Sequence, residues 1–456
     1  MTAPALLRGD LPPAVRVPPP GPRSRELSAA LGAHEAPGVN TLWGGAPSPP
    51  SIAWQEALGA NVLDVDGNVH VDLTAGFGVA AVGHRHPRVV AALREQSGRL
   101  LHGLGDVHGH PLRAELARRL GALAPVDDPQ VFFAVSGAEA VEIALKTALA
   151  ATGRPGILAF EPAYHGLTLG ALAATSRPAF RSPFAAHLHN HVRRLPFGSG
   201  TAGLADVERE LARGDVACAL VEPIVGREGV LVPPAGWLAG LAEACRRHGA
   251  LLAADEVFTG FGRTGRLFAV EHEGVRPDLL CCGKALGGGV PIAAVVGRRE
   301  VFRCWEVPGE ALHTATFVAN PLGCAAALAV LDVLEDEDLV ARATRLGGAL
   351  GERLAGWPDR LAGVVAVRGR GLLWGAEVAD RAAAGRLVAG ALARGVLVLA
   401  GGPAGRVAQI VPPLTIAEEQ LAAAVGLLEE VLAGLDEPVS ALNDLSGLSQ
   451  DTGSGR

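Results

Sequence analysis

Short apolar runs separated by amphipathic stretches fill the chain from about residue 75 to residue 330. These runs occupy residues 131–135, 156–160, 217–221, 250–254 and 293–297. Continuous apolar strands that alternate with helices are typical of a mostly parallel sheet with helices on both faces. The pattern therefore predicts an α/β fold with one large domain over residues 75–330.

The flanking segments carry different patterns. Residues 60–73 alternate apolar and polar positions around Asp66-Gly67, which predicts a β-hairpin. Residues 331–434 combine helical patterns with an apolar run at 395–399, and we expect them to form a smaller α+β domain with residues 39–74. Residues 1–38 are rich in Pro, Gly and Arg, and residues 435–456 in Ser, Gly and Asp. Neither end shows apolar periodicity, so we expect a disordered leader and a disordered tail.

Composition and charge exclude several classes of partner. The formal net charge of the 456 residues is −7 without a basic tract, so nucleic acid and anionic membranes have no electrostatic site. No apolar stretch reaches the roughly 20 residues that cross a bilayer, and no apolar signal core follows the N-terminus. The six cysteines lack C-x-x-C spacing, which indicates reduced thiols. We expect a cytoplasmic enzyme that acts on small molecules.

Two residue types are unusually scarce. Lys146 and Lys284 are the only lysines among 40 basic Lys and Arg residues, and Tyr164 is the only tyrosine. Unlike guanidinium, an amine can lose its proton and form a Schiff base with an aldehyde. Lys284 follows a short apolar run and opens the glycine-rich stretch Gly283–Gly289, as expected of a catalytic amine. Lys146 lies on a helical pattern, and we expect it at the surface.

Two further positions match the needs of one cofactor. Ser136, Gly137 and Ala138 stand where a strand enters a helix, and such a helix start binds phosphate through its free N–H groups. Asp255 follows another strand and faces the ligand crevice of an open sheet. Separately, the first motif could be an ordinary capped helix, and the acidic residues could form a helix cap or a salt bridge. Together with Lys284 they provide the phosphate cradle, ring carboxylate and aldehyde-binding amine that pyridoxal 5′-phosphate requires.

With these motifs in place, the chain resembles the class III aminotransferases, a family of fold type I pyridoxal-phosphate enzymes. The resemblance covers residues 40–434. It rests on GHRHP at 83–87, SGAEA at 136–140, YHG at 164–166, EPI at 222–224, DEV at 255–257, GFGRTG at 260–265, GKALGGG at 283–289, TF at 316–317, NP at 320–321 and PPLTI at 412–416. It implies that residues 75–330 form the cofactor-binding domain.

The resemblance also implies roles for individual residues. Tyr164 would stack on one face of the cofactor ring and Val257 on the other, and Asp255 would pair with the pyridine nitrogen. Glu222 and His165 would support the ring. The phosphate would bind Ser136, Gly137, Ala138 and, from the second subunit of a homodimer with shared active sites, Thr316.

The implied reaction is transamination of an amine or amino acid to a 2-oxo acid through an aldimine at Lys284. The freed Lys284 amine would also act as the general base. An amino-acid racemase or epimerase of the same family uses the same residues and is the alternative. Loss of optical activity without amine transfer would identify it.

Four positions of the pocket depart from the family pattern, and three of them concern carboxylate binding. Leu167 and Gln409 replace two arginines that bind carboxylates in many relatives, and Arg227 replaces a glutamate that gates the second of them. Phe258 replaces a glutamine that bonds the cofactor. Our hypothesis is that Arg227 now binds the substrate anion in a more apolar pocket. The alternative is that Arg227 faces solvent and pairs with Glu228.

Two other motifs have competing interpretations. GFGRTG at 260–265 matches the dinucleotide fingerprint, but its acidic pair precedes the glycines instead of following them, which favours a turn-rich loop near the cofactor. His187, His189 and His191 alternate as metal ligands can, but no carboxylate or cysteine is interleaved. We therefore expect a polar loop there and predict no metal.

Overall fold

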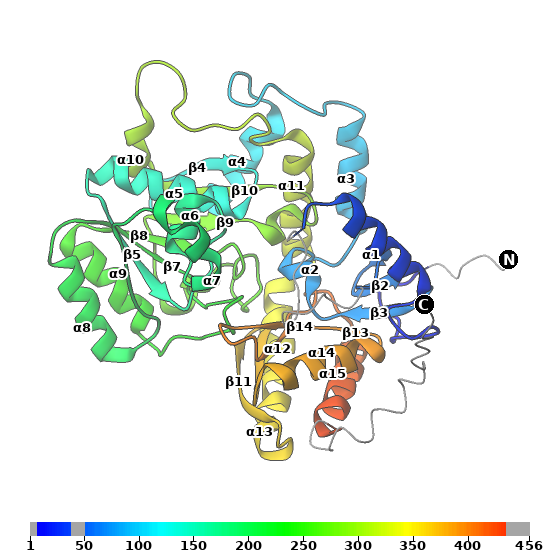
Figure 1. Ribbon diagram of the computed structural model, residues 1–456. Helices are drawn as coiled ribbons and strands as arrows, with labels where there is room; N and C mark the ends of the chain where they lie inside the picture. The colour runs from blue at the N-terminus through cyan, green and yellow to red at the C-terminus, as the bar shows by residue number, and fades with distance from the viewer. Residues whose placement is uncertain (1–6, 38–50, 435–456) are drawn as a thin grey trace, which may run out of the picture.

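The computed structural model describes residues 7–37 and 51–434, and its largest element is a seven-stranded sheet in the order β4-β10-β9-β8-β7-β5-β6 (Figure 1). The strands from β9 to β6 are parallel, and β10 is antiparallel to both of its neighbours. The predicted α/β fold with a mostly parallel sheet is confirmed. In chain order the strands are β4 (Pro129–Ala134), β5 (Gly156–Glu161), β6 (Val192–Pro196), β7 (Val216–Val221), β8 (Leu251–Asp255), β9 (Leu279–Cys282) and β10 (Ala293–Arg298).

Helices cover both faces of this sheet. Successive side chains of a strand point to opposite faces. Ile157 of β5 accordingly joins the buried cluster under helix α5, whereas Leu158 and Phe160 join the cluster that contains Trp237 of helix α9. The rings of Phe160 and Trp237 meet edge to face with centroids 5.1 Å apart. The helices of this domain include α3 (Pro87–Ser97), α4 (Pro111–Leu123), α5 (Gly137–Thr152), α6 (Leu169–Ala174), α7 (Pro178–Arg181), α8 (Gly200–Leu211) and α9 (Trp237–His248).

A smaller part of the molecule holds two four-stranded sheets. The predicted hairpin of residues 60–73 is present as β2 and β3, and β13 pairs in parallel with β3. Segments more than 300 positions apart, from residues 69–72 and 396–397, therefore share one sheet. The first sheet contains β1 (Trp54–Leu58), β2 (Asn61–Asp64), β3 (Val69–Asp72) and β13 (Val396–Leu397), and the second β11 (Val364–Arg370), β12 (Leu373–Val378), β15 (Val407–Ile410) and β14 (Leu399–Gly401).

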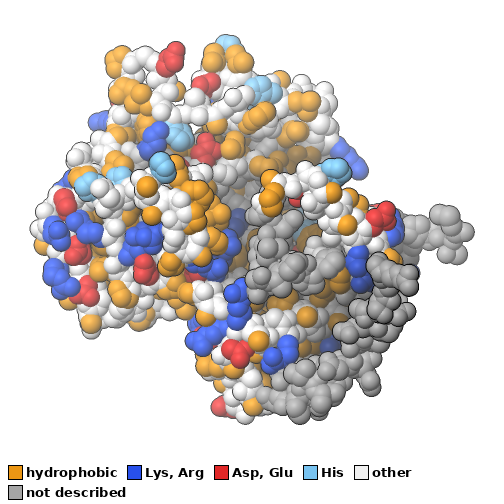
Figure 2. Space-filling view, in the orientation of Figure 1, with side chains coloured by type: hydrophobic (Ala, Val, Ile, Leu, Met, Phe, Trp, Pro, Cys, Tyr) orange, Lys and Arg blue, Asp and Glu red, His pale blue; other side chains and the backbone are white. Residues whose placement is uncertain are grey.

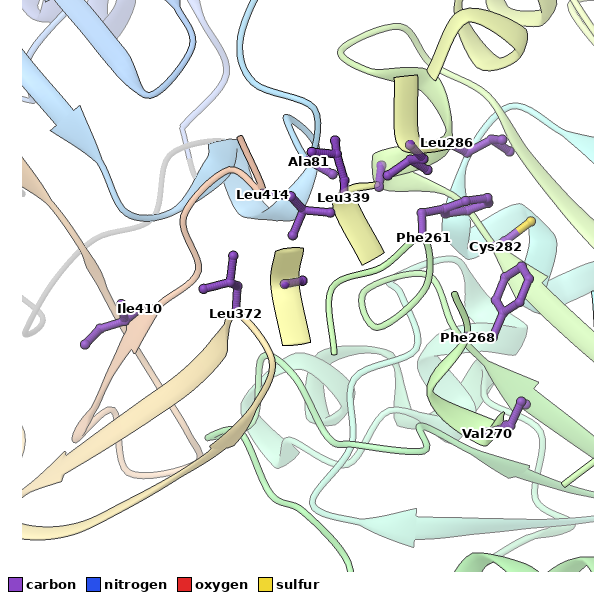
Figure 3. Packing of buried hydrophobic residues seen from close by; sticks show 14 of the residues in the cluster. Ala81, Phe261, Phe268, Val270, Cys282, Leu286, Leu339, Leu372, Ile410 and Leu414 are labelled. Carbon is purple, nitrogen blue, oxygen red and sulfur yellow. The ribbon is translucent and has the colours of Figure 1, made fainter. Parts of the chain in front are cut away.

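Helices complete this part and join it to the large domain. Helix α11 (Pro321–Asp336) runs across the boundary that we expected at residue 330. It is followed by α12 (Leu339–Ala355), α14 (Arg381–Ala393) and α15 (Glu418–Ala433). One buried cluster extends from Phe261 and Phe268 through Leu339 to Leu372 and Leu414, so the two parts share a hydrophobic core (Figure 3).

The N-terminal segment differs from the expected disordered leader. Residues 7–37 include helix α1 (Pro22–His34), which lies beside β2 and β3 (Figure 1). Asp66, in the turn of the hairpin, accepts hydrogen bonds from the backbone N–H groups of Arg23 and Ser24 at 2.8 and 3.0 Å. Asn68 accepts from the N–H of Arg16 at 2.8 Å. Polar contacts of the backbone hold this segment, which explains why apolar periodicity does not reveal it. Residues 1–6, residues 38–50, which include the start of the expected small-domain segment 39–74, and the expected tail at 435–456 lie outside the described residues.

Within the described ranges, no helix is long and apolar enough to cross a membrane.

Candidate active site

The sequence-predicted site residues gather around one cavity of about 550 Å³ at the carboxyl ends of the parallel strands. Strands β7, β8 and β9 each end at it, and the N-terminus of α5 closes one side. The lining consists of Gly137, Ala138, Tyr164, His165, Gly166, Leu167, Thr168, Glu222, Arg227, Asp255, Val257, Phe258 and Lys284. Residues separated by 147 positions in the chain, from 137 to 284, are thus brought into one site.

Lys284 lies two residues after β9, where Gly283 follows the strand, and its φ of 40° falls in the left-handed region. Such strain at a non-glycine residue is typical of functional positions. Its amine lies 3.9 Å from the centre of the Phe258 ring. Burial lowers the pKa of Lys284 from 10.5 to about 8, although Asp255 and Glu222 oppose this shift. A large neutral fraction of the amine is therefore present near pH 8.

Asp255 ends strand β8 and makes two defined contacts. Its Oδ2 lies 2.8 Å from Nδ1 of His165, and its Oδ1 accepts the N–H of Val257 at 3.1 Å. The N–H of His165 donates to Thr175 Oγ1 at 2.9 Å. These bonds fix the orientation of the buried carboxylate. In the described part of the chain, the buried Nε2 atom of His165 has no hydrogen-bond partner.

Glu222 ties the stacking residue to the neighbouring loop. Its carboxylate accepts the N–H groups of Tyr164 and Gly226, each at 2.9 Å. Burial raises the pKa of Glu222 to about 7, while His165 opposes the shift. The carboxylate therefore acts through backbone hydrogen bonds that position Tyr164.

The start of helix α5 is shaped for an anion. Ser136 caps the helix by accepting the N–H of Glu139 at 3.2 Å. The next N–H groups, of Gly137 and Ala138, belong to the first turn and have no partner within the helix. A Cβ atom at Gly137 would lie 2.8 Å from the side chain of Val257, so only glycine allows this approach. Gly166, with φ of 121°, is equally constrained, since its Cβ would lie 2.6 Å from that of Ala138.

Arg227 covers the aromatic wall of the cavity. Its guanidinium lies 4.2 Å from the centre of the Tyr164 ring and 5.4 Å from that of Phe180. Glu228 is buried and pairs at 2.8 Å with Arg177, not with Arg227. The alternative interpretation, in which Arg227 pairs with Glu228 in solvent, is therefore wrong. Across the described ranges, no carboxylate forms an ion pair with Arg227, so its charge is available to a ligand.

Of three other expected residues, two lie outside the cavity and one lies at it. Gln409 is on β15, behind the cavity wall, where its amide donates to the carbonyl of Gly226 at 2.9 Å. Thr316 is exposed and does not line the cavity of its own chain. Leu167 lies at the cavity with 52% of its surface exposed. Of the expected substrate-binding residues, Leu167, Arg227 and Phe258 line the cavity, whereas Gln409 lies behind its wall.

The remaining motifs lie outside the cavity. The GFGRTG loop packs on the smaller part of the molecule, where Arg263 is buried and donates to Leu372 and Pro412 carbonyls. It does not line the cavity, contrary to our expectation of a loop near the cofactor. Nδ1 of His189 accepts the N–H of His191 at 3.3 Å. Lys146 is exposed, as expected, with its amine 3.0 Å from His313.

Sequence reasoning missed part of the site. Phe180 lies in the short helix α7 and Arg177 directly precedes that helix, neither of them within a chemical motif, and Thr175 is a hydroxyl residue next to Ser176. Only their three-dimensional contacts with Arg227, Glu228 and His165 reveal them. Gly166 was visible in the YHG motif, but its positive φ was not.

The residues present fit pyridoxal 5′-phosphate. The half-buried amine of Lys284 matches an aldehyde, and the oriented carboxylate of Asp255 matches a ring nitrogen. The first turn of α5 matches a phosphate, and Gly137 leaves space where a side chain would clash with Val257. All of these groups face a cavity of about 550 Å³, which is large enough for the cofactor and a small substrate.

Comparisons with known proteins agree with this geometry. The family model for aminotransferase class-III matches residues 45–432. Acetylornithine aminotransferase of Methanopyrus kandleri is 44% identical over 374 residues, which cover 82% of this chain and 92% of that protein. The solved ornithine aminotransferase of Toxoplasma gondii is 31% identical, with a TM-score of 0.82 over 90% of this chain and 94% of that one. A pyridoxal-phosphate-bound amine transaminase from an uncultivated Pseudomonas species is 30% identical, with a TM-score of 0.81 over 87% of this chain and 98% of that one.

Proposed function

The chain belongs to the class III aminotransferases, and we propose that it transfers the amino group of an amine or apolar amino acid to a 2-oxo acid whose carboxylate binds Arg227. Pyridoxal 5′-phosphate is its cofactor and transamination its reaction, so the racemase alternative and the dinucleotide interpretation are both set aside. The observation that carries the proposal is the guanidinium of Arg227 over Tyr164, without a carboxylate partner among the described residues.

When bound, pyridoxal 5′-phosphate supplies an aldehyde that condenses with amines and a ring that withdraws electrons from the neighbouring carbon. Lys284 provides the amine that holds this aldehyde between turnovers. Because burial lowers its pKa to about 8, the released amine can also accept the Cα proton of the substrate. Lys284 is therefore both the covalent anchor and the general base.

Asp255 would present its carboxylate to the ring nitrogen, and His165 holds that carboxylate in place through the 2.8 Å contact. Tyr164 and Val257 would hold the ring. The N–H groups of Gly137 and Ala138 would bind the phosphate, and Ser136 caps the start of their helix.

The lining supports an apolar group next to the reacting amine. Leu167 and Phe258 stand at positions where many relatives carry polar side chains, and both line the cavity. A carboxylate on the amino-group donor would therefore lack the arginine that binds it in many relatives, because Leu167 stands at that position. The 44% identity to an acetylornithine aminotransferase favours N-acetylornithine as a second candidate donor.

Absorbance of the bound cofactor identifies the donor. Each candidate amine is mixed with the holoenzyme without an oxo acid, and the correct donor bleaches the visible band. We expect apolar amines or amino acids to react faster than N-acetylornithine, and the reverse order would replace our donor assignment by the second candidate. Borohydride reduction of the holoenzyme, followed by peptide mass analysis, should place the covalent label on Lys284.

The role of Arg227 is tested by substitution. Arg227→Ala should raise KM for 2-oxo acids by about 10-fold to 100-fold, because a hydrogen-bonded ion pair contributes about 1.5–3 kcal/mol. Arg94→Ala removes a comparable exposed arginine from the distant helix α3 and should change nothing. An unchanged acceptor KM in Arg227→Ala would remove Arg227 from the site.

We further propose a homodimer with shared active sites. The loop with Leu101 and Leu104 packs against the loop with Thr316 and Phe317, since Asn320 donates to the Leu101 carbonyl at 2.9 Å. Leu101, Leu104 and Phe317 are nonetheless 54–61% exposed, as expected of a surface that a second copy covers. Thr316→Val should weaken cofactor binding although sedimentation shows that the variant is still a dimer. Equal cofactor affinity in this variant would contradict a phosphate contact from the partner.

A cytoplasmic location remains our prediction. All six cysteines lie among the described residues and are free, which suits a reducing compartment. Cell fractionation with an antibody against the chain would test it.

A further inference from the structure

The loop that carries Arg227 is held from the smaller part of the molecule. The carbonyl of Arg227 accepts the N–H of Gly402 at 3.0 Å and the side-chain amide of Gln409 at 3.3 Å. The same amide donates to the Gly226 carbonyl at 2.9 Å. Both acceptors are carbonyl oxygens, so the NH₂ group of Gln409 must face them.

This contact is tightly packed. A Cβ atom at Gly401 would lie 2.6 Å from the carbonyl oxygen of Arg227 and 2.8 Å from the amide nitrogen of Gln409. Glycine at position 401 is therefore what lets strand β14 approach the loop. A second connection runs through Arg177, which donates to Glu228 at 2.8 Å and to the Gly402 carbonyl at 2.7 Å. On the face drawn in Figure 2, basic side chains gather along this junction between the two parts of the molecule.

We propose that Gln409 is a positioning residue that holds the Arg227 guanidinium over Tyr164 and thereby sets where the substrate carboxylate binds. The inference rests on the proposed role of Arg227. Gln409 stands on β15 and does not line the cavity, so it acts through the loop and not by touching substrate. Two residues therefore determine specificity for the carboxylate of the acceptor: Arg227 on the large domain contacts it, and Gln409 on the small sheet holds Arg227 in place.

The geometry dictates which replacements disturb the loop. Methionine at position 409 keeps the length of glutamine but donates nothing, which leaves the Gly226 carbonyl without this donor. Glutamate places an acceptor against two acceptors and repels the loop. Because Arg227 makes no ion pair with a described carboxylate, its guanidinium depends on the loop and on its contacts with the Tyr164 and Phe180 rings for its position.

Kinetics provide the first test. Gln409→Met should raise KM for the 2-oxo acid by about 10-fold, because the loss of one or two hydrogen bonds weakens binding by about that factor. It should leave kcat within about threefold. In the Arg227→Ala background the same change should add less than about twofold, because both substitutions remove one interaction. A full, independent increase in the double variant would overturn the proposal. Gln420→Met is the control, since Gln420 is a buried glutamine that also donates to a carbonyl, that of Leu11.

The single tyrosine provides a readout that needs no turnover. With 3-fluorotyrosine incorporated, the protein carries one ¹⁹F label, at Tyr164, and the stacked guanidinium changes its resonance. In the cofactor-free protein, Gln409→Met and Gln409→Glu should both move this resonance toward the position found in Arg227→Ala, whereas Gln420→Met should not. An unmoved resonance in folded Gln409 variants would refute the positioning role.

The two proposals fail in different ways. If the resonance moves in the Gln409 variants but Arg227→Ala leaves the acceptor KM unchanged, Gln409 positions Arg227 and the carboxylate contact is wrong. If Arg227→Ala raises KM but the Gln409 variants change neither KM nor the resonance, Arg227 binds the carboxylate without help from Gln409.

Discussion

Replacing Lys284 should make the cofactor-free protein more stable. Burial lowers the pKa of Lys284 from 10.5 to about 8, which means that the folded protein disfavours the charged amine. One pKa unit corresponds to about 1.4 kcal/mol, so the full shift corresponds to about 3 kcal/mol. Lys284 is partly exposed, so solvent screening reduces this value, which already includes the attraction of Asp255 and Glu222. We therefore expect Lys284→Met to raise the free energy of unfolding by about 1–3 kcal/mol at pH 7.

The pH dependence fixes the sign of this effect. Below pH 8 the amine is charged in both states, and the whole penalty is present. Between pH 8 and pH 10.5 the unfolded chain binds the proton more tightly, so the stability of the unsubstituted protein rises with pH. The advantage of Lys284→Met should therefore fall below about 1 kcal/mol at pH 10.

Urea unfolding of the cofactor-free proteins, at one protein concentration and at both pH values, measures this difference. Lys146→Met is the matched control, because it removes the other lysine from an exposed helix position. It should change stability by less than about 0.5 kcal/mol at either pH. A Lys284→Met protein that is less stable at pH 7, or whose advantage is equal at pH 10, would refute the argument.

Three further outcomes follow from the site and the core. Asp255→Asn should lower kcat by at least about 100-fold while cofactor still binds, because the ring nitrogen loses its anionic partner; rapid-mixing kinetics would show it. Gly166→Ala should cost about 1–3 kcal/mol and weaken cofactor reconstitution, since φ is 121° and its Cβ would lie 2.6 Å from that of Ala138. Hydrogen bonds from Arg353 and Trp357 lower the pKa of Glu429 from 4.5 to about 2. As pH falls from 4.5 to 2, the protein should therefore lose about 1 kcal/mol of stability. Glu429→Gln should show no such loss in acid titrations.

The cofactor site could be read from the sequence because its chemistry is tied to local structure. Asp255 ends a buried strand, Lys284 follows another, and Ser136 starts a helix after a third. Carboxyl ends of the neighbouring parallel strands β8 and β9 meet at the same edge of the sheet, which brings Asp255 and Lys284 together. Strand β4, beyond the antiparallel β10, runs in the same direction and ends at that edge too. The scarcity of lysine and tyrosine further singled out Lys284 and Tyr164.

The substrate end of the site depends on contacts that no local pattern records. Arg227 lies over Tyr164 because its loop is held by Gln409, 182 positions away in the chain. The partner of Glu228 is Arg177, not its neighbour Arg227, and only packing decides between them.

The sequence thus determined the strands, the helix starts and the reactive groups at their ends. These features depend on the spacing of hydrophobic residues and on turn-forming residues, which are properties of a few consecutive positions. Tertiary structure alone decided which side chains support Arg227, and it ordered the N-terminal segment against Asp66 and Asn68. Those choices depend on hydrogen bonds between distant segments, whose partners become neighbours only after the core has brought the two parts of the chain together.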